Sequence, residues 1–183
     1  MNLFLDLANK RRSVRKYQSK PVEREKILSC LEAARLAPSA SNVQPWKYII
    51  IDEPELKERV CDVAFSGIFF INKFAREAPV IVVIIAEPDL AINTLGKIVQ
   101  GMHFYLLDIG ASIEHFLLQA TELGLGACWL GWFSEARIKR VLTIPKSKKI
   151  VSMISLGYPA EEHPKAKHKK SIEEISSFNS YKA

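Results

Sequence analysis

The residues from Val80 to Ile85 limit most strongly what this chain can fold into. All six are valine or isoleucine, and they follow directly after Pro79. Side chains branched at Cβ favour extended backbone, and an apolar run without polar alternation is typical of a strand covered on both faces. We therefore expect this segment to be a central strand that anchors a sheet.

Helices and strands are interleaved around this run, but they do not alternate strictly. The clearest helix is expected over 108–123, where apolar residues form one stripe and Gly124 provides a stop. Further helices are expected over 2–9, 22–36 and 54–64 and after Ser134, and further strands over 46–52, 127–132 and 150–156. The pattern predicts a layered α/β or α+β domain with a mixed sheet.

Length and charge bound the number of domains and the class of ligand. The chain has 183 residues, of which 48% are hydrophobic, and this suits a single domain spanning 1–183. The formal net charge of +6 would suit nucleic acid, a membrane surface or a phosphorylated small molecule. The two basic clusters, 10–16 and 165–170, lack the interleaved aromatic residues of a single-strand nucleic-acid binder. We expect neither nucleic acid nor a membrane as a partner.

Cysteine usage and the N-terminus indicate the compartment. Cys30, Cys61 and Cys128 are far apart without a Cys-x-x-Cys pair, so they suggest neither a disulfide framework nor a zinc site. The N-terminus has no basic region followed by an apolar run, and the longest apolar run, 78–86, is too short to span a membrane. These features predict a soluble cytoplasmic protein.

Two segments fall outside the regular pattern. Residues 87–107 carry scattered proline, asparagine and glycine, and we expect a mobile segment that covers the binding site. Residues 160–183 are polar and basic, with too little apolar content to pack by themselves. We expect them to form an extended basic tail.

The loop over 37–46, Ala-Pro-Ser-Ala-Ser-Asn-Val-Gln-Pro-Trp, has the composition of a binding loop. Pro38 ends the preceding helix, and the two serines and Asn42 that follow offer hydroxyl and amide groups. The Arg-Arg-Ser-Val-Arg segment over 11–15 supplies guanidinium groups, whose forked geometry suits a phosphate. Together they favour an anion site, and the alternatives are a capped turn for the loop and a solvated basic turn for the arginines.

The sequence contains no motif for metal, nucleophilic or nucleotide chemistry. Its four histidines, His103, His115, His163 and His168, have no ligand spacing, and a Gly-x-Ser-x-Gly elbow, a Gly-x-Gly-x-x-Gly fingerprint and a Walker loop are missing. We therefore expect no metal site and assign no catalytic side chain.

Five motifs occur in order along nearly the whole chain. They are Arg-Arg-Ser-Val-Arg-Lys-Tyr over 11–17, the 37–46 loop with its Gln-Pro-Trp end, Ala-Pro over 78–79 before the β-branched run, Gly-Leu-Gly over 124–126 before Cys-Trp-Leu-Gly over 128–131, and Leu-Gly-Tyr-Pro over 156–159. One such motif would be a weak signal, but the ordered set resembles the nitroreductase family of flavoproteins.

This resemblance implies an α+β fold with a mixed, mostly antiparallel central sheet flanked by helices, in an interlocked homodimer. It also implies an enzyme with FMN at the subunit interface. NADH or NADPH would reduce the flavin, and a small acceptor such as a nitroaromatic or a quinone would reoxidise it. The flavin would carry the chemistry, while the protein supplies orientation and charge.

The resemblance also implies, position by position, which residues would bind each part of FMN. Arg11, Arg12 and Ser13 would hold the phosphate and ribityl side, and Arg15 would lie at the pyrimidine edge. The other assigned residues are Ser39, Ala40, Ser41 and Asn42 from the second subunit, with Pro38 before them as a further cofactor-binding residue, Trp129, Leu130 and Gly131 at the reactive N5 and O4 edge, and Lys167 and Lys169 at the phosphate.

Two positions depart from the family pattern. Ile68 follows Gly67 where many short members have glutamine, and Lys169 stands where arginine is usual. Enoate reduction, dehalogenation and flavin breakdown stay open as alternative chemistries of the same fold. A basic nucleic-acid or anion-binding module is a distant alternative.

Overall fold

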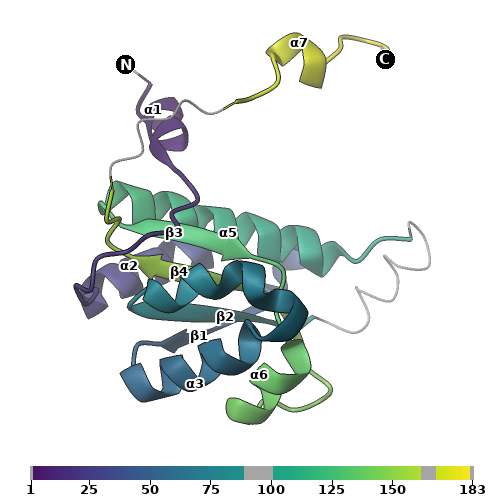
Figure 1. Cartoon of the computed structure of the whole chain (residues 1–183). Helices are drawn as coiled ribbons and strands as arrows, with labels where there is room; N and C mark the ends of the chain where they lie inside the picture. The colour runs from purple at the N-terminus through teal and green to yellow at the C-terminus, as the bar shows by residue number, and fades with distance from the viewer. Residues whose placement is uncertain (1, 89–100, 162–167, 182–183) are drawn as a thin grey trace.

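A computed structural model of the chain describes residues 2–88, 101–161 and 168–181 and shows a four-stranded sheet between helices (Figure 1). The strands are β1 (Trp46–Ile51), β2 (Val80–Ala86), β3 (Gly126–Leu130) and β4 (Lys149–Gly157), in the order β1-β2-β4-β3. All three neighbouring pairs are antiparallel, and a parallel component comes from an isolated bridge between Ser13 and Ala127. The predicted α+β fold with a mixed, mostly antiparallel sheet is confirmed.

The β-branched run forms β2, an interior strand that pairs with β1 and β4. All seven of its residues are buried. Successive side chains of a strand point to opposite faces, so Val82 and Ile84 join one core cluster while Val83 and Ile85 join the other. The run is apolar throughout because both of its faces are covered.

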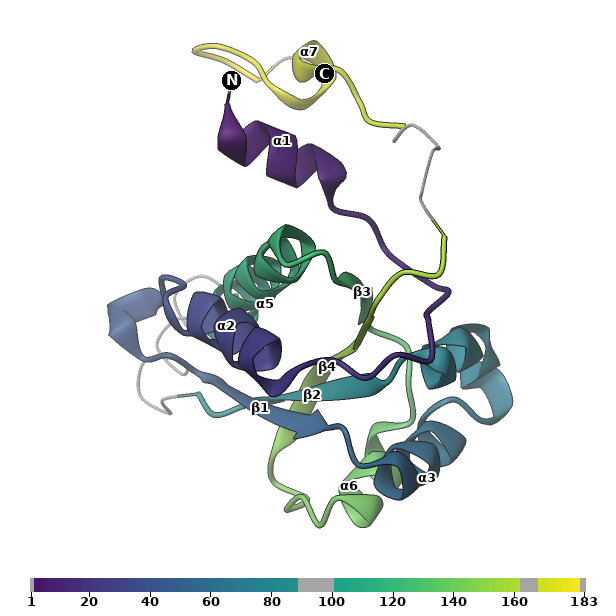
Figure 2. The ribbon, with the colours of Figure 1, turned by 90° about the vertical axis from the view of Figure 1, so that its left-hand side faces the viewer.

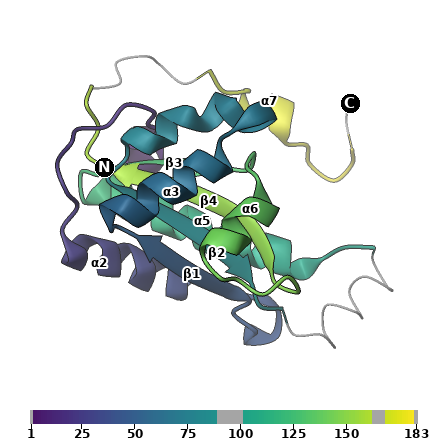
Figure 3. The same ribbon diagram turned by 60° about the horizontal axis from the view of Figure 1, so that its bottom comes forward.

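Helices lie on both faces of the sheet (Figures 2 and 3). One face carries α2 (Arg24–Arg35) and α5 (Phe104–Glu122), and the other carries α3 (Pro54–Ala64), the 3-10 helix η2 (Gly67–Glu77) and α6 (Glu135–Val141). Phe116 of α5 belongs to the first core cluster, and Val60 of α3 and Ile138 of α6 belong to the second. In the described part of the chain, no helix has both the length and the apolar character needed to cross a bilayer.

Two predicted boundaries differ from the structure. The helix α5 starts at Phe104, so residues 104–107 form its first turn, whereas 89–100 of the predicted covering segment lie outside the described residues. Leu106 and Leu107 of this turn are exposed, and Tyr105 is the partly buried residue that packs against the first core cluster one turn before Ile109. The strand predicted over 127–132 ends at Leu130, because pairing with β4 stops there.

The two ends of the chain lie outside the main body. Both α1 (Leu3–Lys10) and α7 (Ile172–Ile175) project on the same side (Figures 1 and 2), and neither has a buried residue. Phe4 is 63% exposed and Phe178 is 86% exposed. These elements therefore present apolar side chains that this chain does not cover.

Candidate active site

An extended strap, defined as residues 11–18, leads from α1 along the edge of β3. The Val14 amide donates to the Ala127 carbonyl at 3.0 Å, and the Tyr17 hydroxyl donates to the Val14 carbonyl at 2.7 Å. The Tyr17 oxygen also lies 2.8 Å from the Ser155 hydroxyl. Burial raises the pKa of Tyr17, so the phenol stays protonated at neutral pH and keeps the strap in place.

Two glycines allow the strap to lie this close to the sheet. A Cβ atom on Gly126 would stand 2.6 Å from a methyl carbon of Val14. A Cβ atom on Gly157 would stand 2.5 Å from the Pro79 ring and 3.0 Å from the Tyr17 ring. The second Gly of Gly-Leu-Gly and the Gly of Leu-Gly-Tyr-Pro therefore act in packing, a role that the sequence analysis did not assign.

A cavity of about 390 Å³, which we call the strap cavity, opens beside this segment. Its lining consists of Arg15, Ile71, Asn72, Phe74, Cys128, Trp129, Leu130, Gly131 and Trp132. The guanidinium carbon of Arg15 lies 5.7 Å from the centre of the Phe74 ring, within the range of a cation–π contact. The structure thus brings Arg15 together with the predicted segment 129–131.

Gly131 faces open space within this cavity. A Cβ atom built on it would have no atom within 4 Å, so a ligand can approach its backbone closely. The neighbouring Trp132 indole donates to the Ile68 carbonyl at 3.1 Å, and the Asn72 amide donates to the Trp132 carbonyl at 2.8 Å. These two bonds join η2 to the loop after β3.

Three lining residues of η2, namely Ile71, Asn72 and Phe74, escaped the sequence analysis. By composition, residues 67–74 are only an aromatic and apolar stretch. Nothing in its composition indicates that one side of this 3-10 helix faces Arg15, because that proximity depends on how η2 packs.

Cys128 lines the same cavity. Burial raises the pKa of its thiol, although Arg15 and Ser13 lower it in part. A thiol with a raised pKa carries little thiolate at neutral pH and is a poor nucleophile. The arrangement therefore suits binding better than covalent catalysis by cysteine.

Arg11 and Arg12 differ in how far their hydrogen-bonding groups are already engaged. The Arg11 Nε atom forms an ion pair with Glu114 of α5 at 3.0 Å. The Arg12 Nη1 atom donates to the carbonyls of Asn9 and Arg11 at the end of α1, whereas its Nε atom is buried with no partner among the described residues. An unpaired buried donor on a cation is costly, so Arg12 is suited to an anionic ligand that completes its bonding.

The 37–46 loop contains the short 3-10 helix η1 (Ala40–Asn42) and an unusual backbone. Ser41, Asn42 and Gln44 have φ angles of 49°, 56° and 53°, in the left-handed region that non-glycine residues seldom adopt. The Ser39 hydroxyl accepts from the Gln44 amide at 2.9 Å, and the Asp108 carboxylate accepts from the Ala40 amide at 3.1 Å. The Ser39 hydroxyl, which the resemblance assigns to cofactor binding, therefore helps to shape the loop within one chain. Ser41 and Asn42 are exposed.

Comparison with known proteins identifies the fold. The model of the Nitroreductase family matches residues 8–72 and 68–158. The chain belongs to the Nitroreductase family. The resemblance read from the five motifs is confirmed.

Relatives and solved structures that resemble this chain match it over most of its length. A candidate NADH dehydrogenase/NAD(P)H nitroreductase of Archaeoglobus fulgidus is 34% identical over 166 residues, which cover 88% of each chain. The structure of an FMN-dependent nitroreductase of Clostridium difficile R20291 is similar with a TM-score of 0.78 and 30% identity, covering 97% of this chain and 99% of that one. An iodotyrosine deiodinase of Thermotoga neapolitana is 23% identical over 199 residues, covering 97% of this chain and 100% of its own.

The 38–42 loop and Lys169 do not line the strap cavity within one chain. Lys169 is exposed in the tail beyond the main body, and Lys167 lies outside the described residues. Within one chain, the strap cavity therefore gathers only Arg15 and the 129–131 segment from the predicted set.

Proposed function

We propose that this nitroreductase is an FMN-dependent oxidoreductase that transfers reducing equivalents from NADH or NADPH to a small acceptor such as a nitroaromatic or a quinone. The strap cavity, in which Arg15 meets the 129–131 segment, is the observation that carries the proposal. The flavin ring would occupy this cavity, and the arginines earlier in the strap would lie toward the phosphate. When bound, FMN would supply the hydride and electron chemistry.

The chain's own residues would bind and orient this cofactor. Arg12 and Ser13, with Arg11 beside them, would hold the phosphate and ribityl side. Arg15 would lie at the pyrimidine edge, where its charge opposes the build-up of negative charge on the ring system. The open space in front of Gly131 would let backbone amides of 129–131 reach the cofactor closely.

We further propose that the active form is a homodimer in which 38–42 completes the site of the second subunit, while Lys167 and Lys169 of the tail complete the phosphate grip. The exposed apolar side chains of α1 and of the tail support this proposal, because they need a partner surface. The site residues that lie apart in one chain would then meet across the interface. We also propose that this oxidoreductase works in the cytoplasm.

The deiodinase relative keeps dehalogenation as a second candidate chemistry. Its 23% identity is lower than the 34% of the NAD(P)H nitroreductase relative, so we favour reduction of a nitroaromatic or quinone. Turnover assays with nitroaromatics, quinones and halotyrosines, all with the same purified protein, would rank these acceptors.

The direct test of the proposed cofactor is an absorption spectrum. The purified protein should be yellow, and denaturation should release FMN that chromatography identifies. A colourless protein that does not bind added FMN would refute the proposed function. If this colourless protein also bound DNA, and bound it more weakly as the salt concentration rises, the result would support a basic nucleic-acid-binding module instead.

Two arginine variants should separate the binding of FMN from the control of its reduction potential. Arg12→Gln should raise the FMN dissociation constant about tenfold, because a charged hydrogen bond contributes roughly 1.5–3 kcal/mol. Arg15→Gln should instead lower the flavin reduction potential by roughly 30 mV, the equivalent of about 1.4 kcal/mol in a two-electron couple. Fluorescence titration and redox titration measure the two effects, and equal shifts of potential in both variants would contradict this division of roles.

A further inference from the structure

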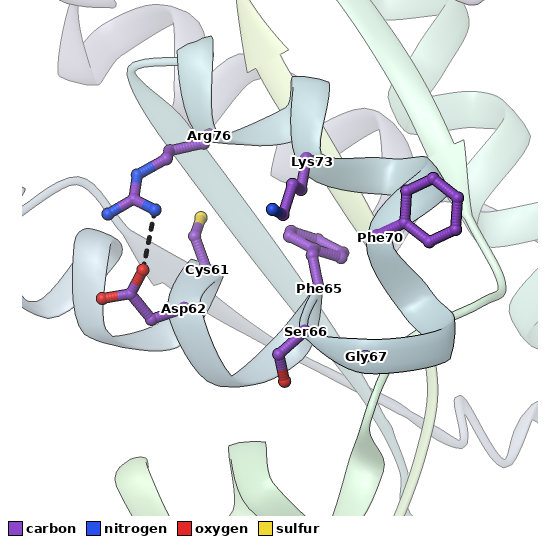
Figure 4. Close-up of a pocket in the computed structure, with 8 residues that line it drawn as sticks. All are labelled: Cys61, Asp62, Phe65, Ser66, Gly67, Phe70, Lys73 and Arg76. Atoms are coloured by element: carbon purple, nitrogen blue, oxygen red, sulfur yellow. Dashed lines mark hydrogen bonds and ion pairs between the residues drawn. The ribbon is translucent and has the colours of Figure 1, made fainter.

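A second cavity lies on the other side of η2, and we call it the η2 cavity. Its volume is about 350 Å³, and it is enclosed by the end of α3 and by η2 (Figure 4). It is lined by Cys61, Asp62, Phe65, Ser66, Gly67, Phe70, Lys73 and Arg76. None of these residues lines the strap cavity, so the η2 cavity is a separate space.

Of the two cations that line this cavity, Lys73 and Arg76, only Arg76 has a counter-charge among the described residues. Arg76 is paired with Asp62 at 2.7 Å and with Glu58, and Glu58 is also 3.3 Å from Lys57. These two cations and two carboxylates compensate one another. Lys73 has no hydrogen bond or ion pair to any other residue in the described part of the chain.

The Lys73 ammonium is placed to meet a ligand inside the cavity. Figure 4 shows it directed over the cavity toward the Phe65 ring and the Cys61 sulfur. Water or a bound anion must therefore satisfy this group. An anion that enters the cavity would gain a charge-assisted hydrogen bond from it.

Apolar groups make up part of the cavity lining. Phe65 is only 2% exposed, and the pKa of Cys61 is raised to about 12 by burial, so its thiol is uncharged at neutral pH. Phe70 adds a second ring that is 63% exposed. A Cβ atom on Gly67 would meet nothing within 4 Å, so the entrance beside it is open.

We propose that the η2 cavity binds a small aromatic carboxylate. The carboxylate would accept from the Lys73 ammonium, and the ring would pack against the exposed Phe70 ring, since aromatic rings pack favourably on one another. The volume lies at the lower end of the roughly 300–1,000 Å³ of small-molecule sites, which suits a single ring. Because η2 also supplies Ile71, Asn72 and Phe74 to the strap cavity, an occupant here touches the same helix as the candidate flavin site.

The test is a fluorine NMR titration of the FMN-saturated protein with 4-fluorobenzoate, and flavin absorbance is followed in the same samples. Lys73→Gln should weaken binding about tenfold or more, since it removes a charge-assisted hydrogen bond. Lys73→Arg should retain most of the affinity, and Lys47→Gln, a change of an exposed lysine on β1, should leave it unaltered. The neutral isostere 4-fluorobenzamide should bind the parent as weakly as 4-fluorobenzoate binds Lys73→Gln.

Two results would each overturn the proposal, namely no binding to the parent, or equal binding by the parent and Lys73→Gln. In the second case, a flavin absorbance change that follows the fluorine signal would place the ligand in the strap cavity. The inference does not rest on the proposed function. If the protein bound no FMN, the same titration without cofactor would still report on Lys73.

Discussion

Replacing Gly131 by valine should abolish FMN binding at concentrations that saturate the parent, while the protein stays folded. The Cβ of the new side chain meets no atom within 4 Å, and Gly131 has no left-handed φ angle, so the fold can accept the change. Its methyl groups would instead occupy the space in which we place the cofactor. Overpacking costs roughly 1–3 kcal/mol, which would raise the FMN dissociation constant by up to about 100-fold.

Gly126→Ala is the matched control for this prediction. Its added methyl would stand 2.6 Å from Val14, so the strap must move away from β3 and the protein should lose stability. Thermal unfolding measured beside FMN titration should therefore separate the two glycines, with a lower Tm for Gly126→Ala and an unchanged Tm for Gly131→Val. Normal FMN affinity in a folded Gly131→Val variant would rule out the cofactor position proposed here.

The central strand could be predicted from sequence because its signal is local. Val80 to Ile85 must be covered on both faces wherever they lie, and any fold that includes them needs two apolar layers. The same holds for the buried stripe of α5, since apolar spacing directly reflects which helical face meets the core. The first turn of α5 was missed because its Leu106 and Leu107 face outward, although Tyr105 packs against the first core cluster.

The candidate site depends on long-range packing, and only part of it could be predicted. Arg15 was assigned by position within a motif, and the structure places it in a cavity with Gly131. Asn72 and Phe74 line the same cavity through the packing of η2 against the loop after β3, which no sequence spacing encodes. That Lys73 of η2 lacks a partner among the described residues likewise becomes visible only once the carboxylates around Arg76 have been located.

The helix α5 links the two parts of the proposed site. Its Asp108 carboxylate accepts from the Ala40 amide of the loop, and its Glu114 carboxylate pairs with Arg11 of the strap, six residues farther along the helix. A rise of about 1.5 Å per residue separates these anchor points by roughly 9 Å along the axis. A rigid helix would therefore hold both binding segments at fixed places on each subunit, as a site shared across a two-fold interface requires.

Mixed dimers of two inactive variants should recover about half of the parent activity per dimer. One variant carries Arg12→Glu and Arg15→Glu, and the other carries Ser39→Trp and Asn42→Trp. Each site of the proposed homodimer takes the arginines from one chain and the 38–42 loop from the other. In a heterodimer one site therefore collects all four substitutions, while the second site is intact.

Two different affinity tags would isolate the heterodimer, and circular dichroism would establish that each variant is folded before mixing. Activity with NADH or NADPH and a quinone is then measured per dimer against the parent. Mixing the Arg12→Glu, Arg15→Glu chain with itself under two tags is the control, and it should stay inactive. If the isolated heterodimer is inactive as well, or if sedimentation shows that the active parent is a monomer, then each chain builds its site alone. The exposed apolar residues of α1 and of the tail would then need another explanation.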